Sequence, residues 1–182
     1  MQYTSTYESP LGNILLAADE IGLTGLWFEG QKYFALCLDR EHEEKELPVL
    51  KQTRKWLDIY FSGKEPDFKL PLHFTGSAFQ KEVWEILYQI PYGQTMTYGA
   101  IAGELAKRRA ASGNGAGGMS AQAVGGAVAR NGISIIVPCH RVVGGNGSLT
   151  GYAGGIDKKI ALLKMEKGYR DTFFIPKKST AP

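Results

Sequence analysis

The chain has 182 residues, of which 43% are hydrophobic and 21% charged, a composition typical of a globular protein rather than a disordered or fibrous one. Cys37 and Cys139 are its only cysteines, and because the three histidines and these cysteines show no CxxC or HxxxH spacing, we expect neither a disulfide framework nor a metal site. The net charge of +3 is unevenly distributed along the chain. Residues 1–74 hold 8 basic and 12 acidic side chains, whereas residues 75–182 hold 13 basic and 6 acidic ones. Either the second half binds a polyanion or the charges merely solvate the surface.

The first residues, MQYTSTYESPLGNILLAADE, have no basic start followed by an apolar core. No apolar run in the sequence approaches the length that spans a membrane. We therefore expect a cytoplasmic protein with no membrane partner.

The first half of the sequence predicts a small α+β unit. Short apolar runs separated by turn signals over residues 1–38 indicate a meander of antiparallel strands. The charged run EHEEKE (41–46) is typical of a solvated loop or the start of a helix. Apolar residues at helical spacing predict a helix over residues 49–61, with Gly63 as its C-terminal signal, followed by the proline-punctuated linker 64–74.

The second half of the sequence is predicted to be mainly helical. Three helices are expected, each after a hydroxyl residue that can cap it: from Ser77 to Ile90, residues 98–109 after Thr97, and residues 121–131 after Ser120. A glycine-rich stretch, 110–119, separates the last two, which together have the outline of a helix-turn-helix. A small-residue helix such as 121–131 can approach DNA closely, but it can equally pack against a neighbouring helix.

The segment IIVPCHRVV (135–143) places a cysteine and a histidine after a short apolar run. Proline ends a strand readily and suits the first turn of a helix, so we expect a strand to end at Pro138 and a short helix to begin at Cys139. A helix N-terminus favours the thiolate, which would make Cys139 a nucleophile and His140 its base through a water. The alternative is a buried structural cysteine. Arg141 is either a phosphate or carboxylate partner or, at least as readily, a solvated or core-capping side chain.

The next segment, GGNGSLTGYAGG (144–155), is either a flexible substrate loop or a chain of turns. Its Tyr152 lies among glycines, and we expect it to be exposed enough to touch a ligand.

Four motifs in order resemble the O6-alkylguanine-DNA alkyltransferases, also called methylated-DNA–protein-cysteine methyltransferases. They are IPYGQTMTYGAIA (90–102), SAQAVGGAVARN (120–131), IIVPCHRVVGGNGSLTGYAGG (135–155) and KKIALLKMEKG (158–168). The resemblance is strong over residues 77–168, whereas residues 1–74 resemble the family's N-terminal domain only in size and strand pattern.

The resemblance implies an α+β fold and a repair activity on double-stranded DNA. A small α/β, RNase H-like domain (1–74) would precede a winged helix-turn-helix-like alkyltransferase domain (75–170) and a tail (171–182). The protein would act as a monomer without a cofactor and transfer the alkyl group of O6-alkylguanine, and of O4-alkylthymine if that lesion is also accepted, irreversibly to its own cysteine. The damaged nucleotide would be flipped into a pocket, and each molecule would act once.

The family's site residues carry over by position. Catalytic roles would fall to Cys139 as alkyl acceptor, His140 as base, Glu166 as the carboxylate that orients it, and Tyr98 as hydrogen-bond donor to the departing guanine. Contacts to the DNA or the flipped base would come from Ser120, Ala121, Gln122, Asn131, Arg141, Tyr152, Ala153 and Gly154. Asn131 would also link the recognition helix, 121–131, to the active-site segment.

The chain departs from the family pattern at several positions. Gln122 stands where the family usually has an arginine that fills the gap left by the flipped base, which predicts weaker DNA binding. Ala153 replaces a serine that contacts the lesion in some relatives, and residues 110–118 lengthen the connection between the two helices. The alternative functions are a non-catalytic sensor of alkyl lesions, which retention of Cys139 disfavours, and a Cys-His hydrolase on another fold.

Overall fold

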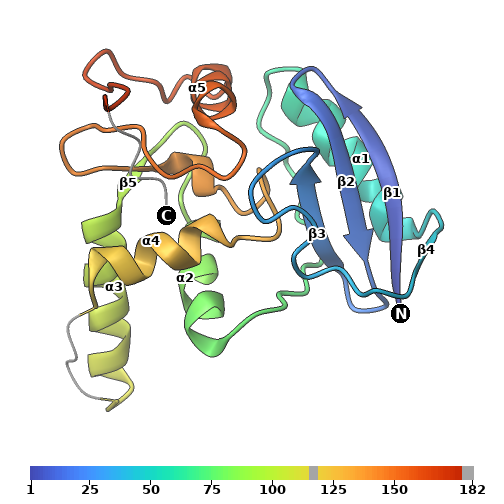
Figure 1. Ribbon diagram of the computed structural model, residues 1–182, viewed down its shortest axis with the longest axis horizontal. Helices are drawn as coiled ribbons and strands as arrows, with labels where there is room; N and C mark the ends of the chain where they lie inside the picture. Colours follow the sequence, from blue (N-terminus) through green and yellow to red (C-terminus); the bar gives the residue numbers. More distant parts are fainter. Residues whose placement is uncertain (115–118, 178–182) are drawn as a thin grey trace. The chain divides into compact units, whose positions relative to one another are not determined.

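A computed structural model of the chain describes residues 1–114 and 119–177, which divide into two compact units (Figure 1). Unit 1 comprises Met1–Gly76 and Gly132–Ile135, and unit 2 comprises Ser77–Asn131 and Ile136–Pro182. The last part of the predicted insertion, residues 115–118, and the end of the predicted tail, 178–182, lie outside the described residues.

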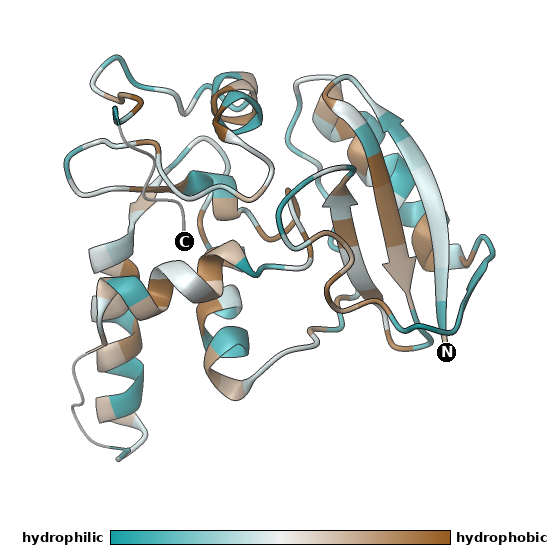
Figure 2. Ribbon diagram, viewed as in Figure 1, coloured by the Kyte–Doolittle hydropathy of each residue, from teal (hydrophilic) through white to brown (hydrophobic). Residues whose placement is uncertain are grey.

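Unit 1 is built on a four-stranded sheet with the strand order β3-β2-β1-β4. The strands β1 (Gln2–Ser9), β2 (Gly12–Ala18) and β3 (Leu23–Phe28) pair antiparallel in sequence order, which confirms the predicted meander. β3 is buried along its whole length, and Figure 2 shows that β2 and β3 are more hydrophobic than β1. The predicted helix is α1 (Pro48–Phe61), which packs on this sheet through Leu50, Thr53, Leu57 and Tyr60.

The expected loop or helix start at residues 41–46 is wrong. The segment contains β4 (His42–Glu44), which pairs parallel to the start of β1 and is exposed at all three residues. Charged side chains on a short edge strand discourage further strand pairing. A charged run therefore fits the edge of a sheet as well as it fits a loop.

Unit 2 holds the three predicted helices, α2 (Ala78–Tyr88), α3 (Tyr98–Ala111) and α4 (Ala121–Ala129), which pack on one another. The Ser77 hydroxyl accepts a hydrogen bond from the backbone N–H of Gln80, and the side-chain Oε1 of Gln80 accepts one from the backbone N–H of Ser77, so the predicted capping box is confirmed. Thr97 caps α3 and Ser120 caps α4 in the same way. The indole of Trp84 on α2 donates to the carbonyl oxygen of Ala127 on α4 at 2.9 Å, which fixes these two helices against each other.

The segment around the cysteine differs from the prediction. Residues 134–136 form a turn rather than a strand, with Ile135 at a φ of 69°, and the expected helix is a single 3-10 turn, η1 (Cys139–Arg141). β6 (Val142–Val143) follows at once and pairs in parallel with β5 (Met96–Thr97). The β-branched valines favour the strand. This pairing sets the nucleophile segment beside the first turn of α3.

The segment 144–155 is a chain of turns that hydrogen bonds and side-chain packing hold in place. Backbone hydrogen bonds join Gly144 to Ser148 and Leu149 to Phe174. Leu149 is buried with Val143 and Leu163 of α5 (Ile156–Met165). The first half of this segment is therefore held by residues on both sides of it.

Candidate active site

Cys139 lies in the core of unit 2, with 5% of its surface exposed. Asn131, two residues past the end of α4, directs its side-chain amide at this segment: Nδ2 donates to the carbonyl oxygen of Val137 at 2.8 Å and lies 3.2 Å from the sulfur of Cys139. The amide thus joins the end of the predicted recognition helix to the predicted nucleophile.

The burial of Cys139 changes the expected chemistry of its thiol. Burial raises the pKa of Cys139, more than the hydrogen bond from Asn131 and the positive charge of Lys159 lower it. A single 3-10 turn also has little of the dipole that a longer helix would offer. Backbone hydrogen bonds of Cys139 and His140 at the start of η1 also lower the pKa, as expected at a helix N-terminus, but burial outweighs them and shifts the balance toward the neutral thiol.

His140 and Glu166 form a fully buried pair, because the imidazole Nε2 lies 2.7 Å from Oε1 of Glu166. Burial would raise the pKa of Glu166, but the hydrogen bond and charge of His140 and those of Arg141 hold it well below its usual value. The carboxylate is therefore ionised, and Nε2 of the imidazole carries the hydrogen that it donates. Among the described residues no atom accepts from or donates to the other nitrogen, Nδ1, although it is buried.

The imidazole of His140 is held in its neutral form. Burial lowers the pKa of His140, and the positive charges of Arg141 and Lys159 add to this effect, while Glu166 opposes it. A neutral imidazole whose Nε2 donates to a carboxylate has a free lone pair on Nδ1, so His140 is able to accept a proton there.

Arg141 faces inward, which corrects the prediction that it contacts DNA or the base. Its Nε and Nη2 donate to the two oxygens of Glu166 at 2.8 and 2.9 Å, and its Nη1 donates to the carbonyl oxygen of Ile90 at 2.6 Å. The sequence left open a carboxylate partner, and that partner is Glu166. Arg141 thus fixes the carboxylate that orients His140.

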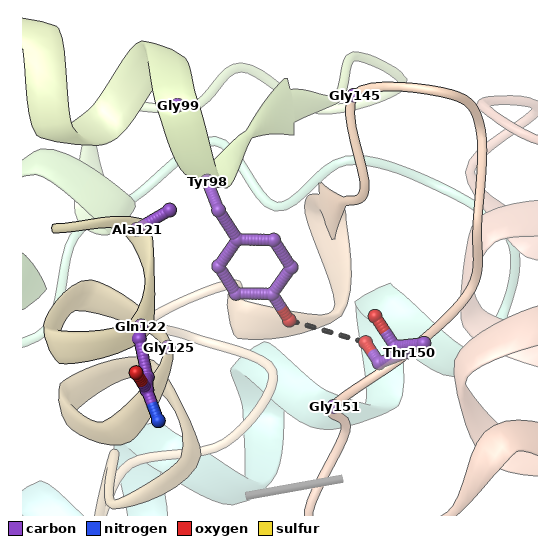
Figure 3. Close-up of a pocket in the computed structure, with 8 residues that line it drawn as sticks. All are labelled: Tyr98, Gly99, Ala121, Gln122, Gly125, Gly145, Thr150 and Gly151. Carbon is purple, nitrogen blue, oxygen red and sulfur yellow. Dashed lines mark hydrogen bonds between the residues drawn. The ribbon is translucent and has the colours of Figure 1, made fainter. Parts of the chain in front are cut away.

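A pocket of about 340 Å³ lies in unit 2 between the first turns of α3 and α4 and the segment 145–151. Figure 3 shows the ring of Tyr98 projecting from the start of α3 across this pocket toward Thr150. The Tyr98 hydroxyl donates to the carbonyl oxygen of Thr150 at 3.1 Å. Burial and the nearby Cys139 raise the pKa of Tyr98 to about 12, so the hydroxyl keeps its proton.

The predicted DNA-contacting residues on α4 lie at the mouth of this pocket. Ala121 and Gln122 line it and are exposed, while the exposed Ser120 uses its hydroxyl to cap the helix. The other residues that line the pocket are Tyr98, Gly99, Gly125, Gly145, Thr150 and Gly151. Exposed residues at the start of a helix beside a pocket are well placed to meet a large ligand.

Tyr152 is buried, contrary to the prediction that it is exposed. Only 7% of its surface is accessible, and its ring meets the ring of His140 edge to face, with the centroids 6.3 Å apart. A Cβ added at Gly154 would lie 2.7 Å from the Tyr152 ring, so glycine is needed there for the chain to fold over the ring. Ala153 and Gly154 are themselves half-buried. Tyr152 therefore supports the histidine more directly than it lines the pocket.

The sequence analysis missed Lys159, which is fully buried on α5. Its Nζ donates to the carbonyl oxygens of Val142 and Thr150. The signal was present, because Lys159, Leu162, Leu163 and Glu166 repeat at the spacing of one helix face and all four are buried. A lysine beside apolar residues is normally interpreted as a solvated side chain. Because Lys158 and Lys159 are adjacent, the sequence alone did not show that only Lys159 is buried.

Across residues 1–114 and 119–177 we find no group of three or more His, Cys, Asp or Glu side chains that could hold a metal ion. No helix in the same residues is long and apolar enough to cross a membrane.

Two sequence families match the chain. Residues 2–74 match the 6-O-methylguanine DNA methyltransferase, ribonuclease-like domain, and residues 78–168 match the 6-O-methylguanine DNA methyltransferase, DNA binding domain. Together they account for both halves of the predicted α+β fold.

Curated relatives and solved structures agree with these matches. The methylated-DNA–protein-cysteine methyltransferase of Methanosarcina acetivorans is 44% identical over 164 residues, which are 90% of this chain and 97% of the relative. The constitutive enzyme of that name from Bacillus subtilis is 37% identical over 169 residues, 92% of this chain and 96% of the relative. The crystal structure of Mycobacterium tuberculosis OGT in complex with DNA aligns with a TM-score of 0.75 and 40% identity over 91% of this chain and 92% of that one.

Proposed function

Because the chain belongs to the 6-O-methylguanine DNA methyltransferase family, we propose that it repairs O6-alkylguanine in double-stranded DNA with Cys139 as the alkyl acceptor. The class of reaction is direct reversal of DNA damage by transfer of an alkyl group to a cysteine of the protein itself. Cys139 carries this role in our proposal because it directly precedes His140 of the buried His140–Glu166 pair and lies in unit 2 together with the pocket that Tyr98 lines, whereas Cys37 belongs to unit 1.

The single observation that most supports the proposal is the one-sided bonding of the His140 imidazole. Nε2 is bonded to an ionised Glu166, and Nδ1 is buried without a bond to the described residues. Such an imidazole accepts a proton at Nδ1 while the carboxylate stabilises the resulting cation. A water between Nδ1 and the sulfur of Cys139 completes the path for the thiol proton.

The displacement balances without any cofactor. The thiol proton passes to His140, the sulfur attacks the alkyl carbon, and a carbon–sulfur bond forms as the bond from carbon to O6 breaks with its electron pair staying on oxygen. The guanine anion gains one proton, which balances the one that the thiol gave up. The protein has no means to cleave the thioether, so each molecule reacts once.

Tyr98 acts on the departing base in this proposal. Its hydroxyl stays protonated up to about pH 12 and reaches into the pocket, where it donates a hydrogen bond to the guanine as negative charge develops. In the free protein it donates to the Thr150 carbonyl oxygen. It therefore exchanges one acceptor for another when the base enters.

The remaining predicted contacts divide between DNA and base. Ser120, Ala121 and Gln122 begin α4 at the pocket mouth and would meet the duplex, with Gln122 filling the space that the flipped nucleotide leaves. The backbone of residues 150–154 would bound the base on the other side. We assign DNA binding and alkyl acceptance to residues 75–170 of a monomer, with residues 1–74 in a supporting role.

Intact mass after incubation with a duplex that holds one O6-methylguanine tests the proposed function. We expect the mass to rise by one methyl group in place of a hydrogen, no rise for Cys139→Ala, and an undiminished rise for the control Cys37→Ala. An unchanged mass together with tight binding of the damaged duplex would overturn the proposal in favour of a lesion sensor.

Substituting Gln122→Arg should tighten binding to unmodified duplex DNA. An added cation near the phosphates releases about one more counterion, so the plot of log affinity against log salt should steepen by ~0.9. Filter binding or fluorescence anisotropy across a salt series measures both quantities. Gln89→Arg, at the end of α2 and away from the pocket, serves as the control, and equal affinity and slope for Gln122→Arg and the wild type would contradict the expectation.

A further inference from the structure

One wall of the pocket, residues 144–151, is rich in glycine and needs contacts from elsewhere in the chain to be ordered. Four of its eight residues are Gly144, Gly145, Gly147 and Gly151. Ordering such a segment costs more conformational entropy than ordering one with larger side chains. Figure 3 shows that the wall faces Gln122 across the pocket, which Gly145, Thr150 and Gly151 line. The contacts that hold this wall therefore determine how a base would fit.

Some of these contacts come from residues 171–175, which we call the C-terminal strap. The strap lies beyond residue 168, where the match to the DNA binding domain ends. Phe174 forms an isolated parallel bridge with Ser148 of the wall. The amide of Leu149 donates to the carbonyl oxygen of Phe174 at 2.9 Å, and the amide of Phe174 donates to the carbonyl oxygen of Gly147 at 3.1 Å. The strap thus bonds to the wall on both sides of Ser148.

The backbone of the strap lies too close to Gly147 for a side chain at that position. Gly147 has a φ of 91°, and a Cβ added to it would lie 2.8 Å from the carbonyl oxygen of Thr172. A backbone oxygen cannot swing aside as the end of a flexible side chain can. Glycine at position 147 therefore allows the strap to reach the wall.

The side chain of Phe173 connects the strap to both sides of the pocket. Its half-buried ring packs against a buried cluster that includes Val143 and Leu149. Leu149 belongs to the wall. Val143 pairs with Thr97, the residue before Tyr98, whose ring projects across the pocket (Figure 3). One aromatic ring thus packs on the wall and on the strand pair that leads to Tyr98.

The side chains that follow Phe173 do not share this packing. Phe174 and Ile175 are 43% and 55% exposed. Phe174 bonds to the wall through its backbone, which almost any residue can supply. The strap therefore offers two adjacent phenylalanines, one with its ring packed beside the wall and one with its ring exposed, as a matched pair for an experiment.

We propose that Phe173 is a positioning residue for alkyl transfer, which through the C-terminal strap holds the pocket wall at the distance from Tyr98 that seats the flipped base for reaction with Cys139. This inference rests on the proposed function of Cys139. Phe173 affects the seating of the base, whereas His140 accepts the proton. With its ring removed, the wall opens locally more often, and the base occupies the reactive position for less of the time.

Single-turnover transfer from a duplex with one O6-methylguanine, measured at rising protein concentration, tests this role. Phe173→Ala should lower the limiting rate by ~10-fold or more, since a small displacement of a reacting group is costly in rate. Its affinity for unmodified duplex should stay within ~2-fold of the wild type, because contacts to phosphates dominate that affinity. Phe173→Leu keeps an apolar side chain and should react within ~3-fold of the wild-type rate.

Phe174→Ala is the matched control and should leave both the limiting rate and the affinity unchanged. A folded Phe173→Ala that transfers at the wild-type limiting rate would overturn the inference. So would a Phe174→Ala that is as slow as Phe173→Ala, since the packed ring would then have no special part.

Gly147→Ala disturbs the same contact from the wall, because its methyl group would meet the carbonyl oxygen of Thr172. The limiting rate of this variant should also fall. A protein with both Gly147→Ala and Phe173→Ala should be scarcely slower than the slower single variant, since changes that act through one contact are not additive. Full multiplication of the two effects would contradict a common cause in the strap.

Amide hydrogen exchange without DNA, followed by NMR, separates this inference from the proposed function. In Phe173→Ala the amides of Leu149 and Phe174 should exchange faster by ~10-fold or more, while the amides of α2 keep their wild-type rates. No acceleration, or an equal one at all amides, would overturn the inference. If these two amides respond as expected but the wild type never transfers from the damaged duplex, the proposed function fails and the contact between strap and wall stands.

Discussion

Substituting Glu166→Ala is expected to lower the free energy of unfolding of unit 2 by about 3–5 kcal/mol. The side chain is enclosed and accepts hydrogen bonds from both His140 and Arg141. Its removal leaves the Arg141 guanidinium buried with one carbonyl, that of Ile90, as its remaining acceptor. Urea unfolding followed by circular dichroism near pH 7 measures the loss.

A matched control separates this effect from the loss of any glutamate in an ion pair. Glu104 pairs with Arg108 one turn along α3, but both side chains are more than a third exposed. Glu104→Ala should therefore cost no more than ~0.5 kcal/mol. A similar loss of stability for both substitutions would show that the buried contacts of Glu166 stabilise the fold no more than an exposed ion pair does.

The free energy of unfolding at low pH should depend on the ionisation of the same carboxylate, that of Glu166. The pKa of Glu166 in the folded chain lies below its value in the unfolded chain, so its contribution to stability is present above about pH 4.3 and is lost as the pH falls toward the folded value. Glu166→Gln cannot titrate. The stability difference between the wild type and Glu166→Gln should thus shrink below about pH 4, and a constant difference would contradict the assignment.

Local signals predicted the helices of unit 2, because each begins at a cap whose partners are close in sequence. Ser77 and Gln80 bond to each other across three residues, and Thr97 and Ser120 each cap the helix that follows. The same reasoning failed at residues 41–46, where strand formation depends on pairing with Gln2–Thr4 far away in the sequence. Pattern alone predicts such an edge strand poorly.

The sequence shows which residue types stand together at the candidate site, but it does not show the electrostatics of their surroundings. Adjacency of Cys139 and His140 is visible in the sequence, but the sign of the thiol pKa shift depends on burial, which no local pattern reveals. Glu166 was found only through the resemblance to the family. The resemblance to the family placed Arg141 among the DNA or base contacts, yet Glu166 is 25 residues away in the sequence and the fold brings the two side chains together.

Substituting His140→Ala should slow single-turnover transfer near pH 7 by ~100-fold or more, since a positioned general base contributes about 10²–10⁴ in rate. The reason is that burial raises the pKa of Cys139, so the thiol needs an internal acceptor for its proton. Quenched-flow transfer from O6-methylguanine duplex gives the rate. His42→Ala, at an exposed histidine of β4, is the control and should not change it.

The pH dependence distinguishes loss of a base from loss of packing against Tyr152. Burial lowers the pKa of His140, so the neutral imidazole and the wild-type rate should persist to below about pH 6.5, where an ordinary histidine becomes charged. His140→Ala has to rely on solvent to remove the thiol proton, and its rate should rise with pH until the deficit narrows in alkali. A deficit that stays constant across this range would assign His140 a packing role and remove the proton transfer from the mechanism.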